Sequence, residues 1–255
     1  MRDLSIKAGL LLLLALGGAY SVLYSYVGKM AMPDFISGID LLYYYYRLLP
    51  PDLYASFKLL ECSVLALPFA GSSLLTAVYL SSRALSLSWY TLPRFGRKRR
   101  WLVYELKRML FFQSGYLILF NLLLFLLIFF VWGVNADSMY HSQYFVGVGY
   151  GLAWQFPMLV LRQIGLMTAL CLCQVYLALR FQTVVATLAT LLWCLLQVFM
   201  ISLGVFTPFH LGFSPLILSS GSISLALLVG AWVFAACLFV LLYWRINAIE
   251  FSRGE

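Results

Sequence analysis

Long apolar stretches separated by short polar segments form the main pattern along this chain. About 20 residues of helix cross a hydrocarbon core about 30 Å thick. Stretches of this kind predict six transmembrane helices, over 8–27, 59–82, 110–134, 163–179, 183–206 and 222–243. The least ambiguous of them contains the run NLLLFLLIFFV that begins at Asn121. The expected fold class is therefore an all-α membrane protein.

One further apolar segment and the start of the chain need separate interpretation. Residues 144–161 are apolar, but Gly147, Gly149, Gly151 and Pro157 interrupt them, which favours a re-entrant or interfacial segment over a seventh span. The basic start of the chain is similar to that of a signal peptide. No small-residue cleavage site follows the first apolar stretch, so we expect an uncleaved first helix.

Composition excludes the soluble classes. Of the 255 residues, 64% are hydrophobic and 10% are charged, whereas soluble domains have about 45–50% and about 25%. A soluble enzyme, a nucleic-acid-binding protein and a disordered chain are therefore ruled out. The five cysteines lie within apolar runs and lack the spacing of a disulfide framework. Cys171 and Cys173 are two residues apart on a predicted helix, so they face different ways and do not form a metal pair.

The net charge of +8 becomes informative once each basic residue is assigned to a side. With an internal N-terminus, 13 of the 17 basic residues lie inside, and only Lys29, Arg47, Lys58 and Arg162 lie outside. Cytoplasmic loops carry the excess of Lys and Arg in membrane proteins. A seventh span would reduce the asymmetry to ten against seven. The pattern therefore predicts six spans with both termini in the cytoplasm.

Sites for catalysis or energy coupling are scarce. No Gly-x-x-x-x-Gly-Lys-Ser/Thr motif occurs, so we expect no ATP site and no cofactor on this chain. Acidic groups at mid-membrane depth, typical of ion-coupled carriers, are also missing. Asp137 and His141 form the only candidate acid–base pair, and their place in an outer loop favours a solvated pair.

Polar residues occur within or beside the predicted spans, at Gln113, Asn121, Gln174, Gln182 and Gln197. They could line a transport path. Interhelical hydrogen bonds are the default interpretation, because polar side chains in spans commonly bond across helices.

The predicted inner connection, residues 85–108, is the most informative segment. Pro93 and Gly96 are expected to end the preceding helix, and the basic run Arg97–Arg100 leads into an amphipathic piece. Its face of Leu102, Leu106 and Met109 points away from Glu105 and Lys107 in the predicted helix. We expect it to lie along the inner headgroups, with its basic residues near anionic lipid. The alternative is that the charges serve only as a topology signal.

The layout and this segment together resemble the ABC-2-type exporter permeases, in particular the small peptide or antimicrobial efflux type of Gram-positive bacteria. Arg94, Gly96, Arg97, Lys98 and Trp101 match the segment R-x-G-S-R-K-K-W. The serine after the glycine is missing, and an extra arginine precedes the tryptophan. The layout covers nearly the whole chain, whereas the motif covers about ten residues.

The resemblance implies a transport subunit, not an enzyme, in a bacterial plasma membrane. Its partners would be ATP-binding cassette ATPase subunits that carry the ATP and Mg²⁺, a second copy or a sister permease, and membrane lipid, with no nucleic acid. The substrate would be a hydrophobic or amphipathic peptide or lipid. The segment that couples to the ATPase would comprise Arg94, Arg97, Lys98, Arg99, Arg100, Trp101, Tyr104, Glu105 and Arg108.

The resemblance also places outer re-entrant helices between spans five and six, whereas residues 144–161 fall between predicted spans three and four. Two other functions stay open at this point. One is a non-transporting immunity or scaffold protein that binds a partner peptide or complex. The other is an intramembrane enzyme that uses Asp137 and His141.

Overall fold

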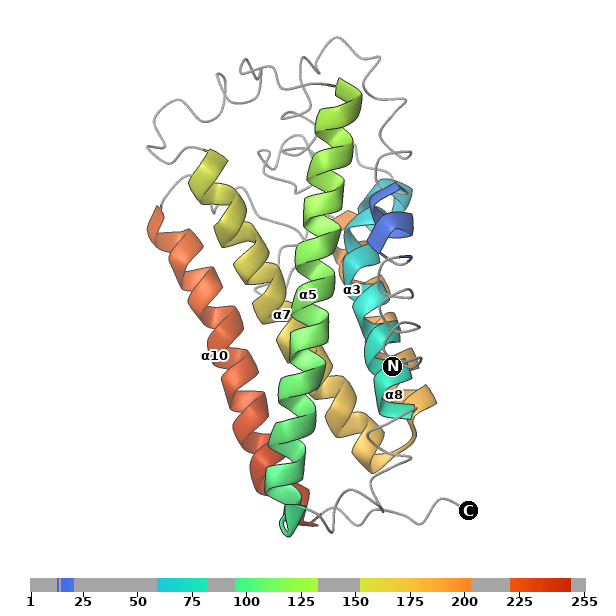
Figure 1. The fold of residues 1–255 in the computed structure, drawn as a ribbon, viewed down its shortest axis with the longest axis vertical. Helices are drawn as coiled ribbons and strands as arrows, with labels where there is room; N and C mark the ends of the chain where they lie inside the picture. The colour runs from blue at the N-terminus through green and yellow to red at the C-terminus, as the bar shows by residue number, and fades with distance from the viewer. Residues whose placement is uncertain are drawn as a thin grey trace.

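The part of the chain described in the computed structural model contains five long helices (Figure 1). They are α3 (Leu59–Tyr79), α5 (Lys98–Trp132), α7 (Leu152–Arg180), α8 (Thr183–Ser202) and α10 (Gly221–Arg245), followed by the short 3-10 helix η3 (Ile246–Ala248). The structure describes residues 13, 15–20, 59–81, 95–132, 152–202 and 221–248, and side chains at 13, 15–20, 66–81, 95–130, 157, 160–200 and 229–247. In this part of the chain the expected all-helical class is confirmed.

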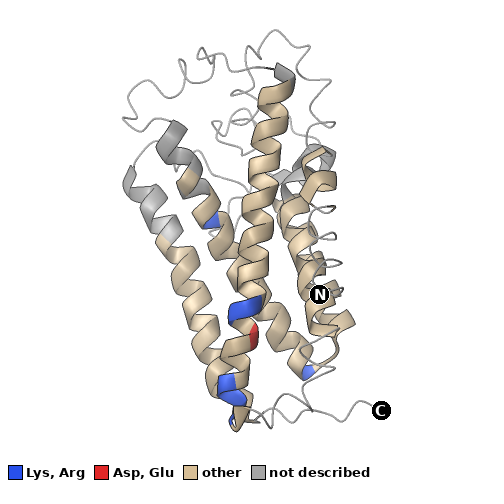
Figure 2. Cartoon of the chain, in the orientation of Figure 1, with Lys and Arg blue, Asp and Glu red and all other residues tan. Residues whose placement is uncertain are grey.

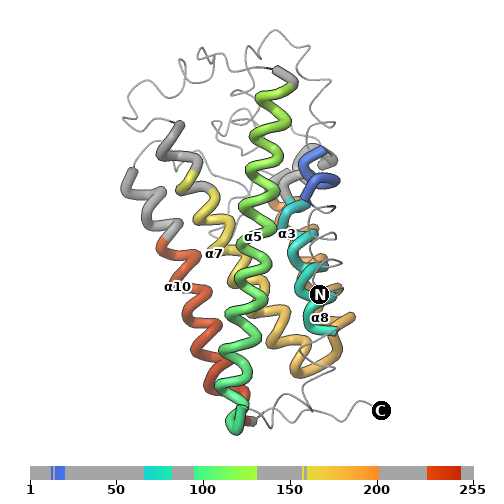
Figure 3. Tube along the Cα trace, in the orientation of Figure 1, coloured from blue at the N-terminus to red at the C-terminus, as the bar shows by residue number. Residues whose placement is uncertain are grey.

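The helices run side by side and alternate in direction along the chain (Figure 3). At one end of the bundle, here called the basic end, α3, α7 and α10 finish and α5 and α8 begin. α3 packs against α8, and α10 packs against α7. Only Phe181 and Gln182 separate α7 from α8, so this pair is a tight antiparallel hairpin. α5, with 35 residues, extends beyond α3 at both ends (Figure 1).

Length and composition identify a membrane protein. Within the described ranges, three helical segments are long and apolar enough to cross a bilayer: Lys98–Phe130, Val160–Arg180 and Thr183–Met200. Shorter apolar stretches, Ala66–Tyr79 and Val229–Arg245, belong to α3 and α10. Large apolar side chains also cover the outside of the bundle, for example Phe111, Leu192 and Phe130. Such a surface suits lipid as the solvent.

The first predicted span, 8–27, is described only at residue 13 and residues 15–20, which are helical. There Ala15 and Ala19 are fully buried. Gly18 lies against α5, because a Cβ atom on it would come within 2.8 Å of the Phe120 ring. The short helix is drawn in blue beside α3 and α5 (Figure 3).

Two expected breaks are absent. Residues 98–108 do not form a separate helix along the membrane plane, since they are the first three turns of α5. The reason is local: α5 contains no proline, and its one glycine, Gly115, lies beyond this segment. Likewise, residues 152–161 are not a separate interfacial or re-entrant piece but the start of α7, which begins directly after Gly151 and continues through Pro157. The remainder of 144–161 lies outside the described residues.

Proline is tolerated at these positions for a physical reason. Pro157 in α7 and Pro68 in α3 each lack an N–H, which frees one carbonyl four residues earlier. Neighbouring helices and local adjustments satisfy such carbonyls in membrane bundles. The glycine and proline pattern therefore indicated the start of α7 but not an interruption within it.

Candidate functional site: the basic end of the bundle

α5 begins at the basic run. Gly96 has a φ of 64°, in the left-handed region that suits glycine, and turns the chain into the helix. The carbonyl oxygen of Arg97 then accepts hydrogen bonds from the backbone N–H groups of Arg100 (3.1 Å) and Trp101 (3.3 Å). Arg94 of the predicted coupling segment lies outside the described residues. The other predicted site residues are all on this start of α5.

The first turns of α5 have two different faces. Arg97, Arg100 and Tyr104 are exposed and follow each other at spacings of three and four residues, so they lie on one side of the helix. We call these three residues the exposed stripe. Trp101 and Leu102, by contrast, are each only 2% exposed. The segment that was predicted as one coupling element is therefore divided into an accessible side and a structural side.

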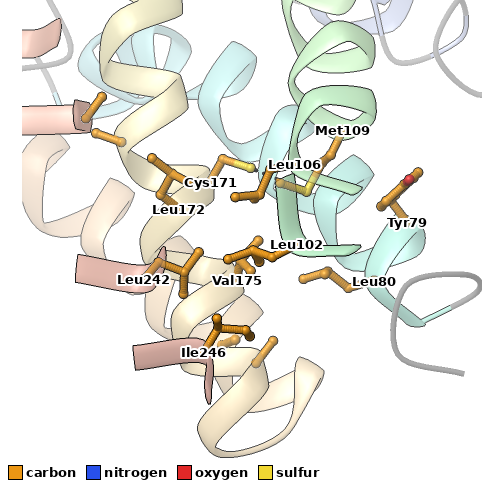
Figure 4. Close-up of a cluster of buried hydrophobic side chains, with 14 of the residues drawn as sticks. Tyr79, Leu80, Leu102, Leu106, Met109, Cys171, Leu172, Val175, Leu242 and Ile246 are labelled. Carbon is orange, nitrogen blue, oxygen red and sulfur yellow. Dashed lines mark hydrogen bonds between the residues drawn. The ribbon is translucent and has the colours of Figure 1, made fainter. Parts of the chain in front are cut away.

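The structural side packs into a large apolar cluster at the basic end. Leu102, Leu106 and Met109 are buried together, which confirms the apolar face predicted for this segment. They meet side chains of α7 and α10, including Leu172, Val175 and Leu242 (Figure 4). The start of α5 is consequently held by three other helices, because Tyr79 and Leu80 at the end of α3 join the same cluster.

Glu105 belongs to the buried side, so the prediction that it points away from the apolar face is wrong. It is 8% exposed and accepts a short hydrogen bond from the hydroxyl of Tyr79. Trp101, Glu105 and Met109 are spaced four residues apart, so the 3.6-residue period places them on one face. The hydrogen bond from α3 satisfies the carboxylate there. Lys107 is exposed, as predicted.

Positive charge gathers at this end (Figure 2). Of the nine Lys and Arg residues in the described ranges, eight lie at the basic end: Arg97, Lys98, Arg99, Arg100, Lys107, Arg108, Arg180 and Arg245. Glu105 is the one acidic residue described there. Exposed aromatic rings lie at the same end, on Tyr104, Phe181 and Trp244. Basic and aromatic side chains together are typical of the boundary between hydrocarbon and water.

Polar side chains in the interior bond mainly to one another. Ser73 of α3 donates to Gln174 of α7 (3.1 Å) and shares a 2.7 Å hydrogen bond with Thr190 of α8. Gln174 in turn donates to the Ser73 carbonyl oxygen (3.0 Å) and to the Thr187 hydroxyl (3.1 Å). Four polar groups thereby join three helices.

Two more interhelical bonds involve α5. Gln113 donates a short hydrogen bond to Thr76 of α3. Asn121 donates to Gln163 of α7 at 2.9 Å. The default interpretation of Gln113, Asn121 and Gln174 as interhelical hydrogen-bonding groups is confirmed. Gln182 is exposed in the α7–α8 connection.

Three buried polar residues on α3 were not predicted from the sequence, and Arg162 was placed incorrectly. Ser72, Ser73 and Thr76 form a buried polar stripe on α3, and their spacing on one predicted helix face was the available signal. Arg162 was expected near the end of a span; it lies ten residues inside α7 and is 3% exposed. It was assigned to the outer loops only because α7 was taken to begin later.

No metal centre is found in the ranges that the structure describes, where no three His, Cys, Asp or Glu residues come together. Cys171 is buried and lies 3.5 Å from the sulfur of Met109 and 3.9 Å from the Thr76 hydroxyl, whereas Cys173 is only partly buried. The two thiols thus have different surroundings, as their spacing predicted. Asp137 and His141 lie outside the described residues.

Comparison with known proteins adds no relative to these observations. No family model, no curated protein and no solved structure matches this chain.

Proposed function

We propose that this chain is the membrane-spanning permease subunit of an ABC exporter, which moves a hydrophobic or amphipathic peptide or lipid with energy from a separate ATPase. In this proposal the chain crosses the membrane six times with both termini in the cytoplasm, and the basic end faces the cytoplasm. The excess of Lys and Arg at that end supports the orientation.

One observation carries the proposal: the exposed stripe begins at Arg97, directly before α5, and continues into the same helix that contains a segment long and apolar enough to cross a membrane. A soluble partner that contacts Arg97, Arg100 and Tyr104 would act directly on a helix about 52 Å long. The buried side of the same turns joins this movement to α7 and α10 through the apolar cluster, and to α3 through the Tyr79–Glu105 hydrogen bond.

The partner's ATP binding and hydrolysis would then shift the population between inward- and outward-facing arrangements of the helices. Apolar contacts and interhelical hydrogen bonds fill most of the described interior, where Ser72 Oγ and Gln113 Oε1 are buried without a hydrogen-bond partner. A substrate path between two copies of the chain, or between this chain and a sister permease, fits this better than a path through one copy.

Co-purification with the ATPase encoded beside the gene tests the proposal. We expect the triple variant R97Q/R100Q/Y104A to lose at least about 90% of the bound ATPase, as for removal of central contacts from an interface. The control R180Q removes an exposed charge from the same end of the bundle, but from α7 and outside the exposed stripe, and it retains the ATPase. If the wild-type chain neither binds nor stimulates the ATPase, the proposal is wrong.

A second candidate is a non-transporting membrane immunity or scaffold protein. The mutual pairing of interior polar groups favours it, because these groups hold helices together and leave few hydrogen-bonding positions for a substrate. The two candidates separate in the same experiment: a scaffold leaves the turnover of any neighbouring ATPase unchanged and still protects cells against its cognate peptide.

A further inference from the structure

The start of α5 and the end of α10 form a fixed corner at the basic end. The guanidinium of Arg99 lies over the Tyr243 ring, 4.8 Å from its centroid. Beneath it, Trp101 and Leu102 of α5 share the apolar cluster with Leu242 and Ile246. The two helix ends are therefore held side by side by both aromatic and apolar contacts.

This corner is basic on one side and aromatic on the other. Trp244 is 72% exposed, and Arg245 next to it is also exposed. Arg99 is partly buried, and its Nε atom is buried without a hydrogen-bond partner among the described residues. A guanidinium that stacks on a ring keeps its N–H groups in the plane of the group, so they reach past the ring edge toward an acceptor.

The charge balance selects an anionic occupant. Eight basic residues share this end with one described acid, Glu105, which is buried and bonded to Tyr79. No described acidic side chain is therefore available to Arg99 and Arg245 at the surface of this end. The group that fits is an acceptor with negative charge, such as a phosphate diester.

The position of the corner favours a lipid as the source of that phosphate. Trp244 and Phe181 are exposed at this end, and exposed aromatic rings mark the headgroup level in membrane proteins. Below Trp244 the exposed surface of α10 is apolar, with Val240 and Leu241 available to acyl chains. Headgroup and chain contacts are thus continuous along one helix.

We propose that the corner formed by Arg99, Tyr243 and Trp244 binds an anionic glycerophospholipid, whose phosphate lies against the Arg99 guanidinium and whose acyl chains lie along α10. Arg245, at the end of α10, adds positive charge beside this site. The bound lipid joins α5 to α10 at the basic end. This inference requires only a membrane protein, and it does not depend on an ATPase partner.

Thermal unfolding of the purified full chain in detergent tests the site. Phosphatidylglycerol, phosphatidylcholine and inorganic phosphate are titrated separately. We expect phosphatidylglycerol to raise the melting temperature by about 4–8 °C, the change for two basic residues that each gain one headgroup contact. Phosphatidylcholine and inorganic phosphate should leave it within about 1 °C of the lipid-free value, because the site requires a charged headgroup and acyl chains together.

The variant R99Q/R245Q should lose more than half of the phosphatidylglycerol shift. The control K107Q/R180Q removes the same charge from the same end and retains the shift. R99K/R245K keeps the charges but loses the planar guanidinium that stacks on Tyr243, so it should retain only part of the shift. If R99Q/R245Q does not fold, R245Q alone, at an exposed position, should still reduce the shift. An equal loss in both double variants, a full response to inorganic phosphate, or an absent shift in the wild type each overturns the proposal.

Discussion

At the scale of single residues, glycine permits close contacts between the described helices. Gly71 of α3 faces Tyr116 of α5, whose hydroxyl occupies the position that a Cβ atom on Gly71 would take. Tyr116 is 1% exposed, so its ring has little room to move. Gly165 of α7 faces Trp232 of α10 in a similar way, with the Trp232 Nε1 atom 3.2 Å from the Cβ position. Small residues at such crossings let helices approach in membranes.

We therefore expect Gly71→Ala to lower the free energy of unfolding by about 1–3 kcal/mol, because the new methyl group overlaps with a buried side chain. Reversible unfolding in mixed micelles measures this value. Tyr116→Phe in the Gly71→Ala background removes the overlapping oxygen and restores part of the loss.

Gly115→Ala is the matched control. Its Cβ would meet nothing within 4 Å, and alanine favours a helix interior over glycine by about 1 kcal/mol. A loss of stability for Gly115→Ala equal to that for Gly71→Ala would contradict the packing explanation.

At the scale of elements, the continuity of α5 is the most consequential departure from the expected layout. Tyr104 and Leu122 are both exposed, are 18 residues apart and lie on the same side of the helix after five turns. Spin labels at these two positions, in a variant without native cysteines, should give a narrow distance distribution near 27 Å.

A bend near Met109, with residues 98–108 along the membrane plane, predicts about 21 Å for the same pair from the two helix lengths. Pulsed electron–electron double resonance distinguishes a distance of about 21 Å from one of about 27 Å. Labels at Val185 and Phe199, both exposed on α8 and about 21 Å apart along a straight helix, give the reference for a helix within one span. A distance near 21 Å for the α5 pair would restore the separate coupling helix.

The sequence predicted a span within each of the five described long helices, and their order, but not where α5 and α7 begin. Hydropathy is low at Arg108 and at Arg162, so a search for apolar windows starts the predicted spans only after these residues. The helices nevertheless begin before these residues of low hydropathy, because a helix continues wherever no proline or glycine pair stops it and packing buries one of its faces. Thr183 at the start of α8 was predicted correctly, since polarity and helix limits coincide in the α7–α8 connection.

The candidate site was predictable as a segment but not as a surface. The basic run and Trp101 identified the start of α5, and the apolar period identified Leu102, Leu106 and Met109. Nothing in the local sequence shows that Glu105 is buried, because its hydrogen-bond donor, Tyr79, is 26 residues away on α3. Likewise, the contact of Arg99 with Tyr243 joins distant parts of the chain.

At the scale of the whole molecule, the charge distribution separates the two ends of the bundle. Arg100 lies at the basic end, and Leu152 begins α7 at the opposite end. In the proposed orientation, Arg100→Cys in intact cells should resist a membrane-impermeant maleimide, whereas Leu152→Cys should react.

Inverted membrane vesicles should reverse the two results. The fraction of each cysteine that the maleimide has blocked is measured from the mass shift on gels, in cells and in vesicles. A variant without introduced cysteines gives the background from native thiols. Reaction of Arg100→Cys from outside intact cells would reverse the orientation of the bundle.

The basic first turn of α5 has one more consequence. Lys98, Arg99 and Arg100 stand at the positive end of the helix dipole, with no acidic residue in that turn. As an isolated peptide, this turn would fray, since each cation there costs about 0.3–1 kcal/mol. It stays helical because Trp101 and Leu102 are buried against α7 and α10. This turn is therefore helical only while α5 packs against α10, and any arrangement that separates the two helices also unwinds it. Amide hydrogen exchange of the turn then reports directly on that separation.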